Sequence, residues 1–167
     1  MKRVNIYTYT TAKNPKASET QCEAYGYIVE CNTTKGPATV SDISTMQGMS
    51  RHQLELRTLI NALRRINTMC EVHVYLDCDY VAAGFKEGWI EQWRANGWMT
   101  ATKKEVKNSR EWNLLDTMVR KFGHQLEFHV KEPHTYRNWL TSNVEKEKQK
   151  CLKSLENSVQ QKKSIEQ

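Results

Sequence analysis

The chain lacks two features that would place it in a membrane or direct it out of the cell. No run of apolar residues approaches the roughly 20 that a membrane-spanning helix needs. The first ten residues, MKRVNIYTYT, begin with charge but have no apolar core of the kind found in signal peptides. We therefore expect no association with a membrane, and the alternating pattern at 4–9 predicts a first strand.

Cysteine is present, but in no pattern that predicts a bond or a metal site. The five cysteines are Cys22, Cys31, Cys70, Cys78 and Cys151, an odd number without a CxxC pair. Structural zinc sites use closely spaced cysteines and histidines, so no zinc site is expected. The simplest interpretation is five reduced thiols, buried or incidental, in a cytoplasmic protein.

Positive charge exceeds negative charge along the chain. There are 25 lysines and arginines against 19 acidic residues, which gives a net charge of +6 and a pI near 9.1. This balance favours a polyanionic partner, although a cationic domain without such a partner would have the same composition. At 167 residues the chain is long enough for one domain with a proper core.

Hydrophobic periodicity predicts a single α/β domain. Strands are predicted at 4–9, 23–31, 38–45, 71–77 and 125–131. Helices are predicted after Ser50, at 79–85, 89–96 and 109–122, and from about 136, with loops at 10–22 and 99–108. The turn signal NTTKGP joins the second and third strands, which indicates three antiparallel strands at the start. Helices between the last two strands imply a parallel crossover. We predict a five-stranded mixed sheet with helices on both faces.

The last part of the chain, 144–167, is rich in Lys, Glu, Gln and Ser. Its apolar residues still trace one side of a helix: Val144, Cys151, Leu152, Leu155 and Val159. We predict a domain over 1–143 followed by this helical extension. The apolar stripe either docks on the domain, leaving a solvated end, or binds a protein partner.

The segment 75–112 combines acidic residues with an aromatic and cationic stretch. Asp77 and Asp79 follow a buried strand, where a divalent metal can be held. Four of the five tryptophans then alternate with lysines and arginines, as on nucleic-acid-binding surfaces. Trp112 lies on an apolar helix face and fits the core, and Trp89 and Trp93 fit packing of their helix onto the domain. Trp98, beside the basic loop, is the better candidate for contact with nucleic acid.

This order of segments resembles type 1 ribonuclease H over about residues 3–143. The matching stretches are NIYT, LELRTLINAL, CEVHVYLDCDYV and GWIEQWRANGWMTATKKEVKNSREW. The resemblance implies the ribonuclease H-like fold and an RNA–DNA hybrid as ligand, gripped by a basic, tryptophan-rich handle over 89–112. The nucleic-acid-binding residues that it implies are Arg51, His52, Trp98, Lys103, Lys104, Lys107 and Asn108.

The resemblance also implies two Mg²⁺ or Mn²⁺ ions held by four carboxylates. Glu55 and Asp77 match two of the four positions. Tyr9 stands where the first aspartate is expected, and a neutral phenol is a poor ligand for magnesium. The late aspartate position falls on Asn143 if the alignment starts from Lys131. It falls on Ser142 if the alignment starts from Asn138.

His134 is the candidate for the mobile histidine that helps product release in this family, although a lone loop histidine is as often surface decoration. His73 alternates with core positions and is interpreted as structural, and His129 carries no functional argument.

Three hypotheses follow. The favoured one is a nucleic-acid-binding protein with impaired or absent hydrolysis. The second is an active metal-dependent ribonuclease with a remodelled site, using Asp79 or Asn143 beside Glu55 and Asp77. The third is a protein-interaction module on the same scaffold.

Overall fold

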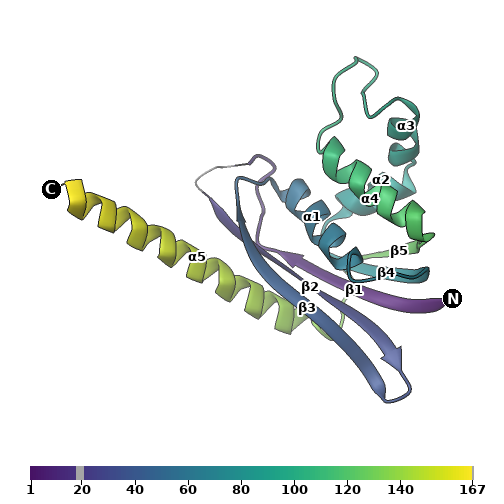
Figure 1. The fold of residues 1–167 in the computed structure, drawn as a ribbon, viewed down its shortest axis with the longest axis horizontal. Helices are drawn as coiled ribbons and strands as arrows, with labels where there is room; N and C mark the ends of the chain where they lie inside the picture. The colour runs from purple at the N-terminus through teal and green to yellow at the C-terminus, as the bar shows by residue number, and fades with distance from the viewer. Residues whose placement is uncertain (18–20, 167) are drawn as a thin grey trace.

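The computed structural model describes residues 1–17 and 21–166, and it contains one five-stranded mixed sheet (Figure 1). The strand order is β3-β2-β1-β4-β5. The first three strands are antiparallel, while β4 runs parallel to both β1 and β5. The strands are β1 (Lys2–Thr10), β2 (Cys22–Thr33), β3 (Gly36–Gln47), β4 (Cys70–Leu76) and β5 (Gln125–Val130). The predicted fold class, including the parallel crossover, is confirmed.

Five helices lie on the two faces of this sheet (Figure 1). They are α1 (Arg51–Leu63), α2 (Asp79–Lys86), α3 (Trp89–Ala95), α4 (Ser109–Phe122) and α5 (Arg137–Glu166). Ser50 is the N-cap of α1, and its hydroxyl accepts from the backbone N–H of Gln53. The loop predicted at 10–22 includes residues 18–20, which lie outside the described part of the chain. None of the described helices is both long enough and apolar enough to cross a membrane.

Alternation along the strands gives the sheet two apolar faces. On one face Val4, Ile6 and Val72 pack with α1 and with the fully buried Trp112 of α4. On the other face Tyr7 and Ile28 pack against the first part of α5. The handle therefore belongs to the first face and α5 to the second.

α5 approaches β2 closely because β2 has a glycine at the crossing point. A Cβ on Gly26 would lie 2.8 Å from Cγ2 of Val144, which is fully buried. Leu140 is buried one turn earlier, and Lys148 forms an ion pair with the buried Glu23 at 3.4 Å. Beyond this docked part α5 projects past the sheet, and Ile165 near its end is 84% exposed (Figure 1).

The helix runs without a break through 143/144, the boundary predicted between the domain and its extension. That division stays a prediction, as does a protein partner for the apolar stripe. The first half of α5 docks on the domain, as one of the two alternatives for the apolar stripe states, and Val144 is buried there. The second half is not docked in this way, since Val159 is 52% exposed.

The expectation of five free thiols is wrong for two of the cysteines. Cys22 at the start of β2 and Cys151 on α5 form a disulfide. They are 129 residues apart in sequence, so no local spacing could reveal the pair, and the docking of α5 brings their Cα atoms to 6.5 Å. Cys31, Cys70 and Cys78 are free. The cytoplasmic location inferred from reduced cysteines stays a prediction.

We predict that this disulfide contributes substantially to stability, because it closes a long loop in the unfolded chain. Replacing both cysteines (Cys22→Ser with Cys151→Ser) should lower the free energy of unfolding by about 2–4 kcal/mol. Denaturant unfolding without reductant measures this, and Cys31→Ser, which removes a free thiol, is the matched control. An unchanged free energy of unfolding in the double variant would contradict the prediction.

Candidate functional site

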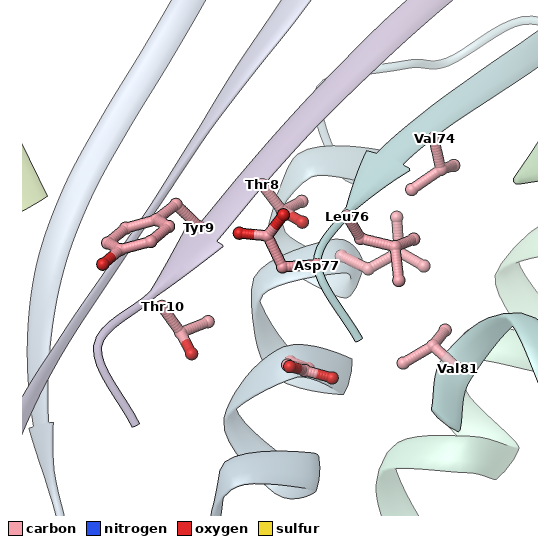
Figure 2. Close-up of a pocket in the computed structure, with 9 residues that line it drawn as sticks. Thr8, Tyr9, Thr10, Val74, Leu76, Asp77 and Val81 are labelled. Carbon is pink, nitrogen blue, oxygen red and sulfur yellow. The ribbon is translucent and has the colours of Figure 1, made fainter. Parts of the chain in front are cut away.

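The ends of β1 and β4 meet α1 at a small cavity. It has a volume of about 20 Å³, enough for roughly one water molecule. Its polar lining comes from Thr8, Tyr9 and Thr10 at the end of β1, Glu55 on α1, and Asp77 just after β4 (Figure 2). The parallel pairing of β1 with β4 brings their carboxyl ends to the same edge. The fold therefore brings together Tyr9, Glu55 and Asp77.

Tyr9 does not turn its hydroxyl toward a metal-binding position. Its ring lies on the side of β1 away from Val74 and Val81 (Figure 2), and its hydroxyl donates to Oε1 of Glu145 on α5 at 2.7 Å. Burial, followed by this hydrogen bond, raises the pKa of Tyr9 to about 12. The phenol is therefore neutral at physiological pH and supplies no charge to a cation.

Asp77 already has a cationic partner. The guanidinium of Arg137, the first residue of α5, donates to both carboxylate oxygens, at 2.7 Å to Oδ1 and 3.3 Å to Oδ2. Such a two-pronged contact is a strong form of charge-assisted hydrogen bond. The hydrogen bond to Asp77 also raises the pKa of Arg137 above its ordinary value. A positive charge thus lies directly beside the Asp77 carboxylate and offsets its negative charge.

Glu55 is the most buried carboxylate of the cavity. Its side chain is 14% exposed, and its Oε2 atom has no hydrogen-bond partner among the described residues. Nε of Arg51 lies 3.5 Å from Oε1, and the nearby thiol of Cys78 favours the ionised carboxylate as well. Burial raises the pKa of Glu55 despite these partners, and burial raises the pKa of Cys78 to about 11.

These residues do not fit a pair of divalent ions. Of the carboxylates lining the cavity, Glu55 is disfavoured as an anion and Asp77 is neutralised by Arg137. Two Mg²⁺ ions need several hard anionic ligands around them. Four other carboxylates could in principle replace a missing metal ligand, but each is either bonded to another residue or exposed. Glu23 bonds to Thr11, Glu30 to Tyr136, Glu145 to Tyr9, and Asp79 is exposed at the start of α2.

The two alternatives for the late aspartate position lie on α5. Asn143 donates from Nδ2 to the carbonyl of Trp139 at 2.7 Å, so its amide serves its own helix. Ser142 is exposed. Neither residue lines the cavity.

His134 is held among aromatic rings. Its ring centroid lies 4.6 Å from that of Tyr7, and its Nδ1 accepts from the backbone N–H of Tyr136 at 3.2 Å. Burial and nearby Arg137 lower the pKa of His134. The half-buried, packed ring does not line the cavity, and its suggested role in product release stays a prediction.

The tryptophans of the handle pack on one another. Trp93 is the centre, with ring centroids 5.9 Å from Trp89, 5.5 Å from Trp112 and 6.4 Å from Trp98. Trp98 is half-buried against this group, while Lys103 and Lys104 are fully on the surface of the following loop. The packed tryptophans thus lie beneath a cationic loop that is exposed to solvent.

The start of α1 lies beside the handle. His52 stacks on Tyr80 at 3.8 Å, and the hydroxyl of Tyr80 accepts from Nε1 of Trp112 at 2.9 Å. Burial, and then the charges of Arg51 and Lys107, lower the pKa of His52, so Arg51 and Lys107 carry the local positive charge. A groove of about 350 Å³ runs here, lined by Tyr80, Trp89, Trp93, Thr100, Val106 and Lys107.

Asn108 precedes α4 in the left-handed region, with φ of 60°, and its buried Nδ2 has no hydrogen-bond partner among the described residues.

Sequence reasoning missed Arg137 and Glu145. Both act through side-chain contacts with residues 60 and 136 positions away, and nothing in the local sequence indicates them.

A strand order of this kind, with a carboxylate-bearing edge and a cationic handle, defines a ribonuclease H-like protein. The family model described as RNase H matches residues 1–138. A ribonuclease H from Verminephrobacter eiseniae is 33% identical over 136 residues, which is 81% of each chain. One from an Acidovorax species is 38% identical over 80% of this chain and 84% of its own. The chain belongs to the ribonuclease H family, whose members generally use a divalent metal.

Solved structures agree on the fold. LC9-RNase H1, a type 1 enzyme with a type 2 active-site motif, superimposes with a TM-score of 0.68 at 16% identity, covering 86% of this chain and 70% of that one. LC11-RNase H1 in complex with an RNA/DNA hybrid gives 0.59 at 16% identity, covering 89% and 99%. At this identity the likeness shows the shared architecture.

The raised pKa of Glu55 predicts a specific pH dependence of stability. Protonation of Glu55 stabilises the fold fully below the ordinary carboxyl pKa, and this contribution is lost as pH rises through the raised pKa. Glu55→Gln should therefore be more stable than the wild type at neutral pH, and the difference should shrink toward about pH 4. Urea unfolding at several pH values measures it, with the exposed Glu156→Gln as control. A less stable Gln variant at neutral pH would contradict the assignment.

Proposed function

We propose that this ribonuclease H family member binds RNA–DNA hybrid through the handle and hydrolyses it poorly or not at all. The single observation that carries the proposal is the Asp77–Arg137 pair, which sets a guanidinium where the family's chemistry needs a metal ion. Tyr9 in place of a carboxylate supports the same conclusion.

The cationic loop supports the binding half of the proposal. Lys103 and Lys104 are exposed beside the tryptophan cluster, with Arg51 and Lys107 near His52. Exposed cations with aromatic rings behind them are suited to a polynucleotide backbone. Family membership and the hybrid bound to LC11-RNase H1 support RNA–DNA hybrid as the ligand.

Reversing the charge of the loop should weaken hybrid binding and reduce its salt dependence. Lys103→Glu with Lys104→Glu should lower the magnitude of the slope of log K against log salt by roughly two, one for each lost phosphate contact. Fluorescence anisotropy of a labelled hybrid at several salt concentrations measures it. The matched control is Lys162→Glu with Lys163→Glu, an exposed pair at the far end of α5.

The binding half fails if the wild type does not bind hybrid, or if the loop variant binds like the control. Double-stranded RNA and double-stranded DNA of the same sequence, tested in parallel, determine which duplex is preferred.

The hydrolysis half predicts little or no cleavage by the wild type. An end-labelled hybrid incubated with Mg²⁺ or Mn²⁺ should be cut no faster than by Glu55→Ala or Asp77→Ala. Cleavage by the wild type that both substitutions abolish would overturn this half and favour the remodelled enzyme.

Tyr9→Asp with Arg137→Ala restores a carboxylate and frees Asp77, and it should gain metal-dependent cleavage. Tyr9→Asp with Arg64→Ala, which removes the exposed arginine that follows α1, is the control.

A further inference from the structure

A second group of charged and metal-ligating side chains lies on β4 and β5, away from the cavity. Glu71 and His73 on β4 alternate with the core residues Val72 and Val74, and so point to the opposite face. Glu127 and His129 on β5 lie on that same face, because Nδ1 of His73 is 2.8 Å from Nε2 of His129 and 3.7 Å from Oε2 of Glu127. His73, Glu127 and His129 can each direct one ligand atom to a common point, since those atoms all lie within 4.8 Å of one another.

Each histidine is oriented by a carboxylate on its outer nitrogen. Nε2 of His73 lies 2.8 Å from Oε1 of Glu71, and Nδ1 of His129 lies 2.5 Å from Oε2 of Glu132. The Glu71 side chain is 45% exposed, and its carboxylate oxygen is positioned to accept this hydrogen bond from His73. Histidines that bind metals typically donate their other N–H to a carboxylate in this way, which fixes the tautomer.

These outer hydrogen bonds leave a conflict between the inner nitrogens. If each ring donates its proton outward, Nδ1 of His73 and Nε2 of His129 present lone pairs to each other at 2.8 Å. Two lone pairs at this distance repel, so the pair requires a cation between them. The cation is either one shared proton or a metal ion.

We propose that His73, His129 and Glu127 form a site for a divalent transition metal of the zinc class, with solvent as the remaining ligand. Imidazole nitrogen and carboxylate oxygen are suitable zinc ligands, and three protein ligands plus water is a known zinc arrangement. Two nitrogens on one tetrahedral zinc lie about 3.3 Å apart, so the rings would separate by roughly 0.5 Å. Glu127 is 60% exposed and free to turn toward the ion.

The site differs from the cavity at the end of β1 in ligands and in position. It uses none of Tyr9, Glu55 or Asp77, and it does not depend on the proposed hybrid binding. A metal here would join β5, the edge strand, to β4. The sequence expectation of no zinc site rested on local spacing, whereas these histidines are 56 residues apart and meet only through strand pairing.

The test uses the full chain, stripped with a chelator and with its disulfide intact. Calorimetric titration with Zn²⁺ should show one equivalent bound, and Zn²⁺ should raise the melting temperature. When Co²⁺ replaces Zn²⁺, the absorption spectrum should show the visible bands of a four-coordinate site with nitrogen and oxygen ligands. It should show no sulfur-to-cobalt charge-transfer band. His129→Gln should lose the one-equivalent binding, and Glu71→Gln should weaken it roughly 10-fold.

Because His73 is buried, Glu127→Gln on the surface provides a substitution that leaves the core intact. It should also weaken binding roughly 10-fold or more, whereas Glu156→Gln should not. Absence of Zn²⁺ binding by the wild type would mean that the two rings share a proton and would overturn the proposal. Equal affinity in the wild type, His129→Gln and Glu127→Gln, or a sulfur-to-cobalt band indicating the free cysteines, would overturn it as well.

Discussion

The docking of the first half of α5 on the sheet is the contact on which the rest of the candidate site depends. Val144 reaches the backbone of β2 because Gly26 has no side chain there. Once the helix is seated, Arg137 at its start reaches Asp77, and Glu145 reaches the hydroxyl of Tyr9. The close packing of Val144 on Gly26, together with buried Leu140, therefore helps to set which side chains meet at the end of β1. A change at this contact would alter the chemistry of the cavity as well as the stability of the fold.

The site retains the family's scaffold while its charge balance is altered. A ribonuclease H site needs enough negative charge to hold divalent cations. Here Tyr9 is a neutral phenol, Glu55 is buried with a raised pKa, and Asp77 is paired with a guanidinium. Tyr9 and Asp77 have partners within the protein, Glu145 and Arg137, whereas Oε2 of Glu55 has none among the described residues. Membership of the family thus establishes the architecture, while the chemistry has to be argued from these side chains.

The strands and the helices were predictable because they depend on short-range patterns. Alternation in the strands, the turn NTTKGP and the helical spacing after Ser50 each lie within a few residues. The assignment of Tyr9 to a carboxylate position of the family rests on the resemblance and stays a prediction. The partners of these residues were not predictable: Arg137 for Asp77, Cys151 for Cys22 and Glu145 for Tyr9 are separated by 60, 129 and 136 residues. Such pairs depend on how one helix lies across a finished sheet.

The disulfide at Cys151 also divides α5 mechanically. The bond lies about halfway along the helix, so the part before it is clamped to the sheet and the part after it is a rod fixed at one end. Residues 152–166 extend this rod by roughly 22 Å at 1.5 Å per residue. The rod leaves the domain on the side away from the handle (Figure 1). Its direction relative to the sheet is therefore set by the disulfide and by the docked half of the helix.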